Sequence, residues 1–302
     1  MNLALTALAT LALAGCSGPT SSGTLGVAAV SHPDVTGTVF TIVFENEAAD
    51  AVLVPANKAF YRLSQQNGRA SAYVSTTHPS LPNYIQLTSG STNGITMDGD
   101  PNVNVPVPGN QNLADQLDAA GIQWRAYMEG MGTPCKFDSS GDYSAHHDPF
   151  VYYASMRNDP ARCVNRIVDF DASFQTDLDS GAYKYMWISP NVCNDMHNCS
   201  ADVADAWLDK TVAQITASKA YQNGGAIFIL FDEGSLRLLG AAADLPTIVM
   251  SPNLVSASFV SDTFYDHRSY LATIEDIFQM PRLPTTIDAT PMNAFFRPKV
   301  GP

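Results

Sequence analysis

Short, mainly apolar runs, of which the one at 226–231 is wholly apolar, alternate along this chain with segments of helical periodicity. The apolar runs have strand length and cover residues 38–44, 122–127, 183–188, 226–231 and 247–250, and the helical patterns cover 113–120, 203–221 and 268–278. Strands that are hydrophobic on both faces need cover on two sides, and helices between consecutive strands favour parallel pairing. The sequence therefore predicts an α/β domain with a mainly parallel central sheet and helices on both faces.

Two of these runs stop abruptly at acidic residues. Glu45 and Asn46 follow the run at 38–44, and Asp232 and Glu233 follow the run at 226–231. In an open α/β sheet the functional site lies beyond the carboxyl ends of the strands. One acidic pair alone would suit an ordinary solvated strand end, but two pairs at the ends of buried strands favour a shared site.

A third polar cluster, between these two in sequence, contains a candidate nucleophile. His78, Ser80 and Asn83 lie on a segment with prolines at 79 and 82. Proline fixes φ and cannot donate to a sheet ladder, so we expect a stiff turn that ends a strand and holds the Ser80 hydroxyl in place. An ordinary surface turn would have a similar composition.

The candidate metal-ligand atoms in these clusters are mostly oxygens. They come from the side chains of Glu45, Asn46, Ser80, Asp232 and Glu233. Such a hard ligand set suits Mg²⁺, Ca²⁺ or Mn²⁺, and nearby imidazoles would also admit Zn²⁺. A divalent cation relieves the repulsion between adjacent carboxylates, lowers the pKa of a serine hydroxyl and draws charge from a phosphoryl oxygen. The sequence leaves the identity and the number of ions open.

Histidines accompany the polar clusters. His147, His197 and His267 are candidates for proton transfer or for donation to a phosphoryl group, and His78 and His146 are weaker candidates. A lone histidine is more often structural than catalytic, so these assignments depend on where the chain brings the rings.

The charge balance argues against nucleic acid as a partner. The chain has 16 Lys and Arg against 29 Asp and Glu, a formal net charge of −13, and no basic run. An acidic protein that handles anionic phosphates needs a local positive charge, most simply a bound cation. No feature of the sequence identifies a protein partner.

The first 16 residues resemble a bacterial lipoprotein signal, because an apolar run ends in the sequence LAGC at Cys16. The resemblance implies export and lipidation of Cys16, with residues 17–35 as a flexible tether and 36–302 as a single folded domain. The missing Lys or Arg before the run departs from this pattern and leaves a plain secretory signal or a misplaced start codon open. The run is shorter than the about 20 residues of a membrane-spanning helix, so we expect membrane contact only through the lipid.

Four further cysteines indicate disulfides, because an even number in an exported protein is typical of them. These four cysteines can form two disulfides in three different ways. We favour Cys135 with Cys163 and Cys193 with Cys199, because the second pair closes a short polar loop. A cysteine metal site is the alternative, which the lack of a CxxC spacing disfavours.

Taken together, the clusters resemble a known family. The segments FENEAADAVL, THPSLPNYIQLTSG, YSAHHDPFVYY, SPNVCNDMHNCS, IFILFDEGS and YDHRSYLATIEDIF occur in this order between about residues 39 and 278. They are similar to the bacterial and fungal acid phosphatase and phospholipase C phosphoesterases of the alkaline-phosphatase-like superfamily. The resemblance implies an alkaline-phosphatase-like α/β fold and hydrolysis through a phosphoseryl intermediate.

The resemblance also implies roles for single residues. It makes Ser80 the nucleophile and a metal ligand, and it puts His147 and His197 near the phosphate. It places the other metal ligands at Glu45, Asn46, Asp232 and Glu233, and it adds Asn83 and His267 as weaker catalytic candidates. The sequence departs from the family pattern in two places. Glu47-Ala48-Ala49 after Asn46 is unusual, and the segment after Gly234 is short and apolar. The second difference affects contacts to a second metal or to the leaving group.

We therefore expect an exported, lipid-anchored, metal-dependent phosphoesterase. We favour acid-phosphatase-like hydrolysis of phosphomonoesters over phosphodiesterase or phospholipase C activity. The alternative from another class is a catalytically inactive lipoprotein that binds anionic molecules. A sulfatase is disfavoured, because the nucleophile segment lacks the C/S-x-P-x-R pattern.

Overall fold

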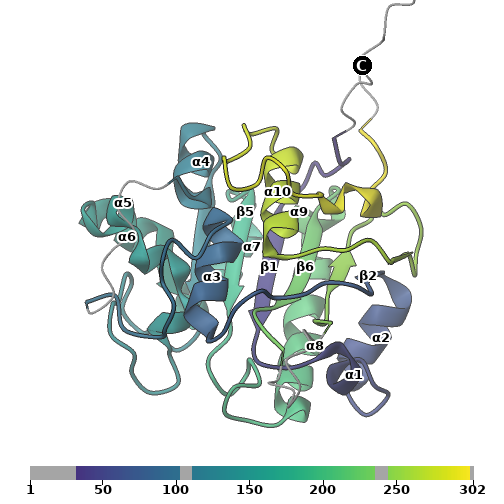
Figure 1. The fold of residues 1–302 in the computed structure, drawn as a ribbon, viewed down its shortest axis with the longest axis horizontal. Helices are drawn as coiled ribbons and strands as arrows, with labels where there is room; N and C mark the ends of the chain where they lie inside the picture. Colours follow the sequence, from purple (N-terminus) through teal and green to yellow (C-terminus); the bar gives the residue numbers. More distant parts are fainter. Residues whose placement is uncertain (1–31, 103–110, 235–243, 300–302) are drawn as a thin grey trace, which may run out of the picture. The chain divides into compact units, whose positions relative to one another are not determined.

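A mainly parallel sheet forms the centre of the structure, a computed structural model that describes residues 32–102, 111–234 and 244–299 (Figure 1). In spatial order, the strands of the described residues are β4 (Ile167–Asp169), β3 (Trp124–Met128), β5 (Tyr185–Ser189), β1 (Val39–Phe44), β6 (Ala226–Phe231), β7 (Ile248–Met250), β2 (Gly68–Ala70) and β8 (Val260–Ser261). The strands from β4 to β6 run parallel to one another, and β7 runs antiparallel to both of its neighbours. The predicted α/β class with a mainly parallel sheet is confirmed.

Helices cover both faces of this sheet, as the burial of the central strands requires. Every residue of β1 and β6 is buried. On one face the Thr41 hydroxyl lies 2.7 Å from the Tyr270 hydroxyl of α10 (His267–Ile277). On the other face the Phe44 ring packs against Trp207 of α8 (Ala201–Ala217). Because successive side chains of a strand point to opposite faces, a strand with no polar side needs helices on both.

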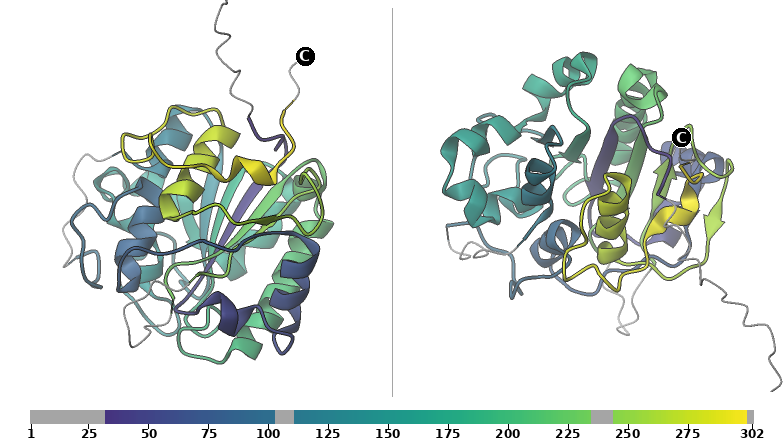
Figure 2. Two further views of the ribbon diagram at one scale, coloured as in Figure 1. Left: turned by 45° about the vertical axis from the view of Figure 1, so that its right-hand side comes forward. Right: turned by 90° about the horizontal axis from the view of Figure 1, so that it is seen from above.

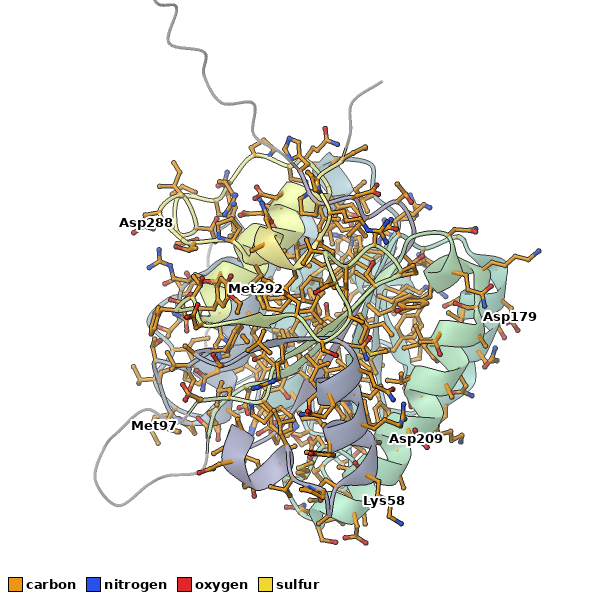
Figure 3. The ribbon with its side chains drawn as sticks, turned by 90° about the vertical axis from the view of Figure 1, so that its right-hand side faces the viewer. Lys58, Met97, Asp179, Asp209, Asp288 and Met292 are labelled. Atoms are coloured by element: carbon orange, nitrogen blue, oxygen red, sulfur yellow. A yellow bond between two sulfur atoms is a disulfide. The ribbon has the colours of Figure 1, made fainter. Side chains whose placement is uncertain are left out.

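In Figure 1, α3 and α10 lie in front of the sheet, and Figure 2 shows helices on both sides of the strands. Charged side chains such as Lys58, Asp179 and Asp209 lie on the outer surfaces of their helices (Figure 3). The remaining α-helices of the described ranges are α1 (Ala49–Val52), α2 (Lys58–Gln66), α3 (Ser80–Ser89), α4 (Leu113–Ala119), α5 (Ala154–Arg157), α6 (Pro160–Arg166), α7 (Phe170–Ser180) and α9 (Lys219–Gln222), and the 3₁₀ helices there are η1 (Ala145–His147), η2 (Pro149–Tyr152) and η3 (Met292–Phe295).

Ser80 begins a helix and does not lie in a turn after a strand. Pro79 is the N-cap of α3, and Pro82 lies in its first turn. Proline suits a first turn, because the first amides of a helix have no partner within it. The two prolines therefore fix the start of α3, which corrects the predicted turn.

The helical pattern at residues 203–221 also differs from the prediction, because it is divided between two helices. α8 ends at Ala217, and the Ser218 hydroxyl caps α9 by accepting from the Tyr221 backbone N–H at 3.2 Å.

The first described residues belong to the folded unit. The Asp34 N–H donates to the Arg297 carbonyl at 2.9 Å, and Val35 is buried. Residues 32–35, predicted as the end of the tether, are therefore part of the domain. The predicted signal with Cys16 and the tether up to residue 31 lie outside the described residues, as does the apolar segment at 235–243. Among the helices of the described ranges, none is both long and apolar enough to cross a membrane.

The structure contains the two disulfides favoured from the sequence. Cys135–Cys163 joins the segment after β3 to α6, and Cys193–Cys199 closes the loop after β5. The second disulfide encloses a six-residue separation and lies next to the polar end of the sheet.

Candidate active site

Three strand ends bring polar residues to one edge of the sheet. β1 leads to Glu45, β6 leads to Asp232 and Glu233, and β5 leads to the loop closed by Cys193–Cys199. β1 pairs with both β5 and β6 in parallel, so these three ends are neighbours. The sheet order therefore gathers both acidic pairs and the disulfide loop in one place.

Ser80 faces this edge from the start of α3. Its hydroxyl donates to Glu45 Oε2 at 2.8 Å, and its side chain is buried. The accepting carboxylate orients the Ser80 oxygen, as an activated nucleophile requires. The N-terminus of a ten-residue helix adds a positive potential that favours an anionic group beside Ser80.

Asp232 lies next to the same hydroxyl and is fully buried. Burial first, and then the charge of Glu233, raise the pKa of Asp232 well above its usual value, while the Ser80 hydroxyl and backbone amides lower it. Asp232 Oδ1 accepts the Asn46 backbone N–H at 3.3 Å, and Asn46 has a left-handed φ of 54° that turns the chain after β1. Within the described residues, Asp232 Oδ2 has no hydrogen-bond partner.

Glu45 completes the buried acidic pair. Burial, followed by the charges of Asp232 and Asp195, raises the pKa of Glu45 well above its usual value. Its Oε1 has no hydrogen-bond partner within the described part of the chain, although His147 Nε2 lies 3.3 Å away.

These carboxylates fit a divalent cation. Their free buried oxygens and raised pKa values both follow from negative charge confined in a buried site. A cation would satisfy the oxygens and remove the repulsion. Glu45, Asp232 and Ser80 are the residues of the predicted ligand set whose side chains the structure brings into direct contact.

Glu233 and Asn83, two further predicted site residues, contact each other. Asn83 Nδ2 donates to Glu233 Oε2 at 3.0 Å, and His78 Nδ1 lies 2.7 Å from the same oxygen. Burial, followed by the charge of Asp98, raises the pKa of Glu233 to about 7. Asn83 also donates to the Pro79 carbonyl at 3.2 Å, so this network holds the start of α3 in place.

His267 has a different position from the one predicted. It is fully buried, and its two ring nitrogens lie 2.6 Å from the Asp232 carbonyl and 3.0 Å from the Tyr73 hydroxyl. Burial lowers the pKa of His267 to about 4. With both nitrogens engaged inside the protein, His267 is not available to a phosphate and instead fixes the Asp232 backbone.

His147 and His197 lie together on the other side of Glu45. Their ring centroids are 5.7 Å apart, and the His147 ring stacks on Tyr84 at 5.2 Å with an interplanar angle of 4°. His147 is buried and His197 is exposed. His146 points elsewhere, because its Nε2 is 3.8 Å from Asp100.

Two acidic residues that sequence reasoning missed support this region. Asp195 is fully buried, with its Oδ2 at 2.9 Å from His147 Nδ1. Glu129, the residue after β3, accepts from the Asn191 backbone, the Asn194 amide and the Trp207 indole at 2.9–3.0 Å. Burial raises the pKa of Glu129. Its position directly after a strand is the signal that identified Glu45.

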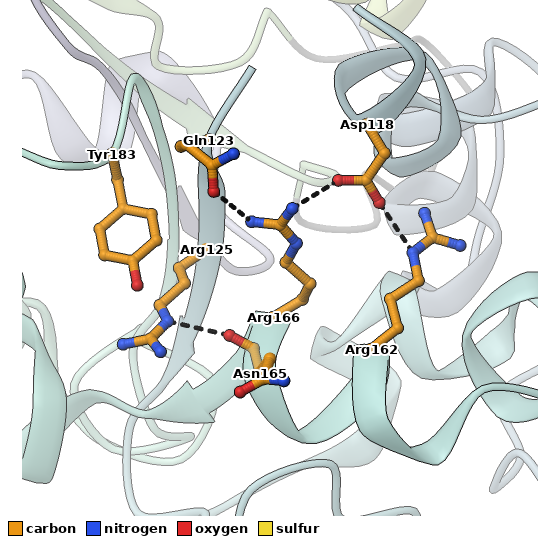
Figure 4. Close-up of a pocket in the computed structure, with 7 residues that line it drawn as sticks. All are labelled: Asp118, Gln123, Arg125, Arg162, Asn165, Arg166 and Tyr183. Atoms are coloured by element: carbon orange, nitrogen blue, oxygen red, sulfur yellow. Dashed lines mark hydrogen bonds and ion pairs between the residues drawn. The ribbon is translucent and has the colours of Figure 1, made fainter. Parts of the chain in front are cut away.

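A cavity of about 390 Å³ near the start of β3 is separate from this site (Figure 4). It is lined by arginines, but Arg162 and Arg166 pair with Asp118 at 2.8 and 2.7 Å, and Arg125 pairs with Asp177 at 2.6 Å. Each of these guanidinium groups therefore already has an acidic partner.

Comparison with known proteins gives one family and one fold. The family model described as "Phosphoesterase family" matches residues 57–281. A phosphate-repressible acid phosphatase of Penicillium chrysogenum is 27% identical over 236 residues, which are 74% of this chain and 54% of that protein. The chain thus spans a little over half the length of this fungal relative.

Two other comparisons cover more of the matched protein. A phosphatidylinositol-3-phosphatase of Mycobacterium tuberculosis is 27% identical over 275 residues, which are 89% of this chain and 85% of that protein. A crystal structure of an alkaline phosphatase superfamily protein from Vibrio parahaemolyticus has a TM-score of 0.59 and 12% identity, over 86% of this chain and 71% of that one. At this identity the structural match concerns the fold alone.

Proposed function

The chain belongs to the Phosphoesterase family and has an alkaline-phosphatase-like fold, and from this premise we propose that it is a metal-dependent hydrolase of phosphate monoesters with Ser80 as nucleophile. The observation that carries the proposal is the Ser80 hydroxyl, held 2.8 Å from Glu45 at a helix N-terminus and beside a second buried carboxylate. Both the fungal and the mycobacterial relative are named as phosphatases, which supports monoesters over diesters.

In the proposed reaction, the Ser80 oxygen attacks phosphorus in line with the departing oxygen. The Ser80 hydroxyl loses its proton to solvent, the bond to the leaving group breaks and the leaving oxygen takes up a proton. Water later cleaves the phosphoseryl ester, which releases orthophosphate and restores the hydroxyl. Glu45 orients the attacking oxygen, because it accepts the Ser80 hydrogen bond. The start of α3 favours the negative charge that the phosphoryl group brings.

The other site residues hold this arrangement. Glu45, Asp232 and Ser80, with Asn46 and Glu233 beside them, would bind the divalent cation. A bound cation would lower the pKa of the Ser80 hydroxyl and neutralise charge on the phosphoryl oxygens.

The neighbouring side chains complete the proposed roles. Asn83 holds Glu233 at the start of α3. His267 fixes the Asp232 carbonyl. His147 and His197 are proposed to stabilise the transferred phosphoryl group from the far side of Glu45.

Substitution of Ser80 by alanine tests the nucleophile. S80A should reduce hydrolysis of p-nitrophenyl phosphate to background while the circular dichroism spectrum stays that of the wild type. S89A, at the other end of the same helix, is the matched control and should keep activity. An acid quench of the wild type during turnover should trap phosphoserine at residue 80, detected by peptide mass spectrometry. Full activity in S80A would remove this serine from the mechanism.

The choice of substrate separates the alternative functions. We expect the wild type to hydrolyse p-nitrophenyl phosphate faster than bis-p-nitrophenyl phosphate or phosphatidylcholine, and a chelator should stop the reaction. Faster diester cleavage would favour phospholipase C or phosphodiesterase activity. Binding of cation and orthophosphate without turnover of any substrate would favour the inactive anion-binding protein.

We further propose that the protein is exported as one phosphoesterase domain on a lipid-anchored tether. Its two disulfides support an oxidising compartment. Mass spectrometry of the N-terminal peptide from membrane fractions should find lipid on Cys16, and C16S should move the protein to the soluble fraction. An unmodified Cys16 in the mature protein would contradict the anchor.

A further inference from the structure

The start of α3 carries a contact that the proposed reaction does not use. The Leu81 N–H donates to Asp98 Oδ1 at 3.0 Å, and Leu81 directly follows Ser80. A carboxylate therefore already lies on the helix start to which the proposed reaction brings a phosphoryl group. We propose that Asp98 is a built-in competitor of that group, and that phosphate binds fully only when this carboxylate leaves the Leu81 amide. The inference rests on the proposed function, because that function brings phosphate to Ser80.

The two prolines make the Leu81 amide one of few donors at the helix start. The N-cap residue and the first three residues of a helix have N–H groups without a partner inside the helix. In α3 these positions are residues 79–82, and Pro79 and Pro82 have no N–H. Only Ser80 and Leu81 can therefore offer such a backbone N–H to an anion, and Asp98 occupies one of the two.

The charge of Asp98 also acts on the rest of the site. After burial, it is the second cause of the raised pKa of Glu233, which Asn83 of α3 holds at 3.0 Å. Both carboxylates act against a further anion at this place, because like charges repel. Removal of the Asp98 charge therefore favours phosphate binding in addition to freeing the amide.

Asp98 can leave the amide without a rearrangement of the backbone. Its side chain is exposed, and the preceding Met97 lies on the surface with 66% of its area exposed (Figure 3). The following residue is held, because the Gly99 carbonyl accepts the Tyr152 hydroxyl at 2.6 Å. Rotation of one exposed side chain is thus enough to open the Leu81 amide, and the anchored backbone keeps Asp98 within reach to return.

A competitor of this kind changes affinity and not the chemical step. The bound ester, the transition state and orthophosphate all need the same amide, so Asp98 opposes each of them equally. Its loss should lower KM and the dissociation constant of orthophosphate together, without raising kcat. A purely structural role for Asp98 as a cap of α3 predicts the opposite sign, because loss of a cap would loosen the helix start and weaken phosphate binding.

Calorimetric titration with orthophosphate tests the proposal on wild type, D98A and D98N at pH 7.5, with Mg²⁺ or Mn²⁺ present throughout. D98A should bind orthophosphate about 10-fold more tightly or better, because a hydrogen bond to a charged group contributes at least about that factor. D98N keeps a neutral acceptor and should lie between wild type and D98A. The KM of D98A for p-nitrophenyl phosphate should fall by the same factor as its orthophosphate dissociation constant.

Asp100 provides the matched control, because it is an acidic residue of the same segment that faces away from α3. Its Oδ1 accepts the Ser139 hydroxyl at 3.2 Å and lies 3.8 Å from His146 Nε2. D100N should bind orthophosphate with wild-type affinity. An equal gain in D100N and D98N would mean a general effect of charge and would overturn the proposal.

Two further outcomes separate this inference from the proposed function. Unchanged or weaker orthophosphate binding in D98A and D98N, while the wild type hydrolyses p-nitrophenyl phosphate, would overturn the role of Asp98 alone. D98N keeps an acceptor for the Leu81 N–H, so it answers the question even where D98A unfolds. Tighter orthophosphate binding in both variants, without hydrolysis by the wild type, would refute the proposed function and leave the competition by Asp98 standing.

Discussion

Substitution of Asp232 by asparagine should remove most of the stabilisation that divalent cations give to the folded protein. Asp232 and Glu45 are fully buried, and the charge of Asp232 contributes to the raised pKa of Glu45. Ionised carboxylates in such a site destabilise the folded state, and a cation reverses that effect. D232N keeps the shape of the side chain and one oxygen for the Asn46 amide, but it removes a charged ligand.

The size of the effect follows from linkage. A cation at about 100 times its dissociation constant stabilises the folded state by about 2.7 kcal/mol. In a domain of this size 1 kcal/mol moves the melting temperature by about 2–4 °C, so the wild type should gain roughly 5–11 °C. D232N should gain less than about 2 °C, because most of the differential affinity is lost. Without cation, D232N should melt no lower than the wild type at pH 7.5, since the raised pKa of Asp232 makes its ionisation unfavourable in the folded state.

Asp205 offers a matched control, because it is a buried aspartate with a purely structural environment. It accepts the backbone N–H groups of Ala59 and Phe60 at 2.8 and 2.9 Å, at the start of α2. Loss of its charge in D205N should cost about 2 kcal/mol and lower the melting temperature by roughly 4–8 °C, with or without cation. The gain on cation addition should remain that of the wild type.

Scanning calorimetry on chelator-treated protein, with Mg²⁺, Ca²⁺, Mn²⁺ or Zn²⁺ added back, measures all of these shifts. A full cation gain in D232N would refute the ligand role of Asp232. No gain in the wild type with any of the four ions would refute the cation site itself.

Three further outcomes are expected from single changes. Burial raises the pKa of Glu275, so the folded state holds that proton more tightly than the unfolded state, and stability is lost as the pH rises from about 4.5 towards the raised value. The melting temperature of the wild type relative to E275Q should therefore fall between pH 4.5 and 7.5, and a rise would contradict the assignment. E129Q should increase hydrogen exchange at residues 191–199 without changing it in α3, and unchanged exchange in that loop would show that Glu129 does not organise it. The double variant C193S/C199S should lower kcat at least tenfold. C135S/C163S should mainly lower the melting temperature, because its disulfide closes a 28-residue separation worth about 3.6 kcal/mol. Equal effects on kcat would contradict a special role for the smaller loop.

The sheet was predictable because its central strands are apolar on both faces and end in charged residues. In a chain of this length, a parallel sheet covered by helices on both faces is the architecture that buries such strands. The start of α3 was not predictable in the same way, because two prolines around Ser80 suit a turn and a first helical turn equally well. Residues 32–35 gave no signal either, since the backbone N–H of Asp34 makes the contact and any side chain would allow it.

Some residues of the candidate site could likewise be predicted from the sequence, and others could not. Glu45 and Asp232 could be found because each follows a strand, and Glu129 was missed although the same rule applies to it. Asp195 was harder to find, because two of its three contacts to the site involve backbone atoms of Glu45 and His197. Such contacts depend on the path of a loop, which local residue patterns do not determine. His267 looked catalytic in sequence because burial cannot be read from a single histidine.

The pairing of Asp34 with Arg297 has a practical consequence for handling the protein. The N–H groups of Thr36 and Gly37, which follow Asp34, donate to the Gly224 carbonyl just before β6 begins, so this pair lies at the edge where the parallel strands start. The six residues of β1 put about 20 Å between that edge and Glu45. A resin, a fluorophore or a fusion protein joined at either end of the unit is therefore separated from Glu45 and Ser80 by the length of the strands, and immobilised protein should keep the turnover of the free form.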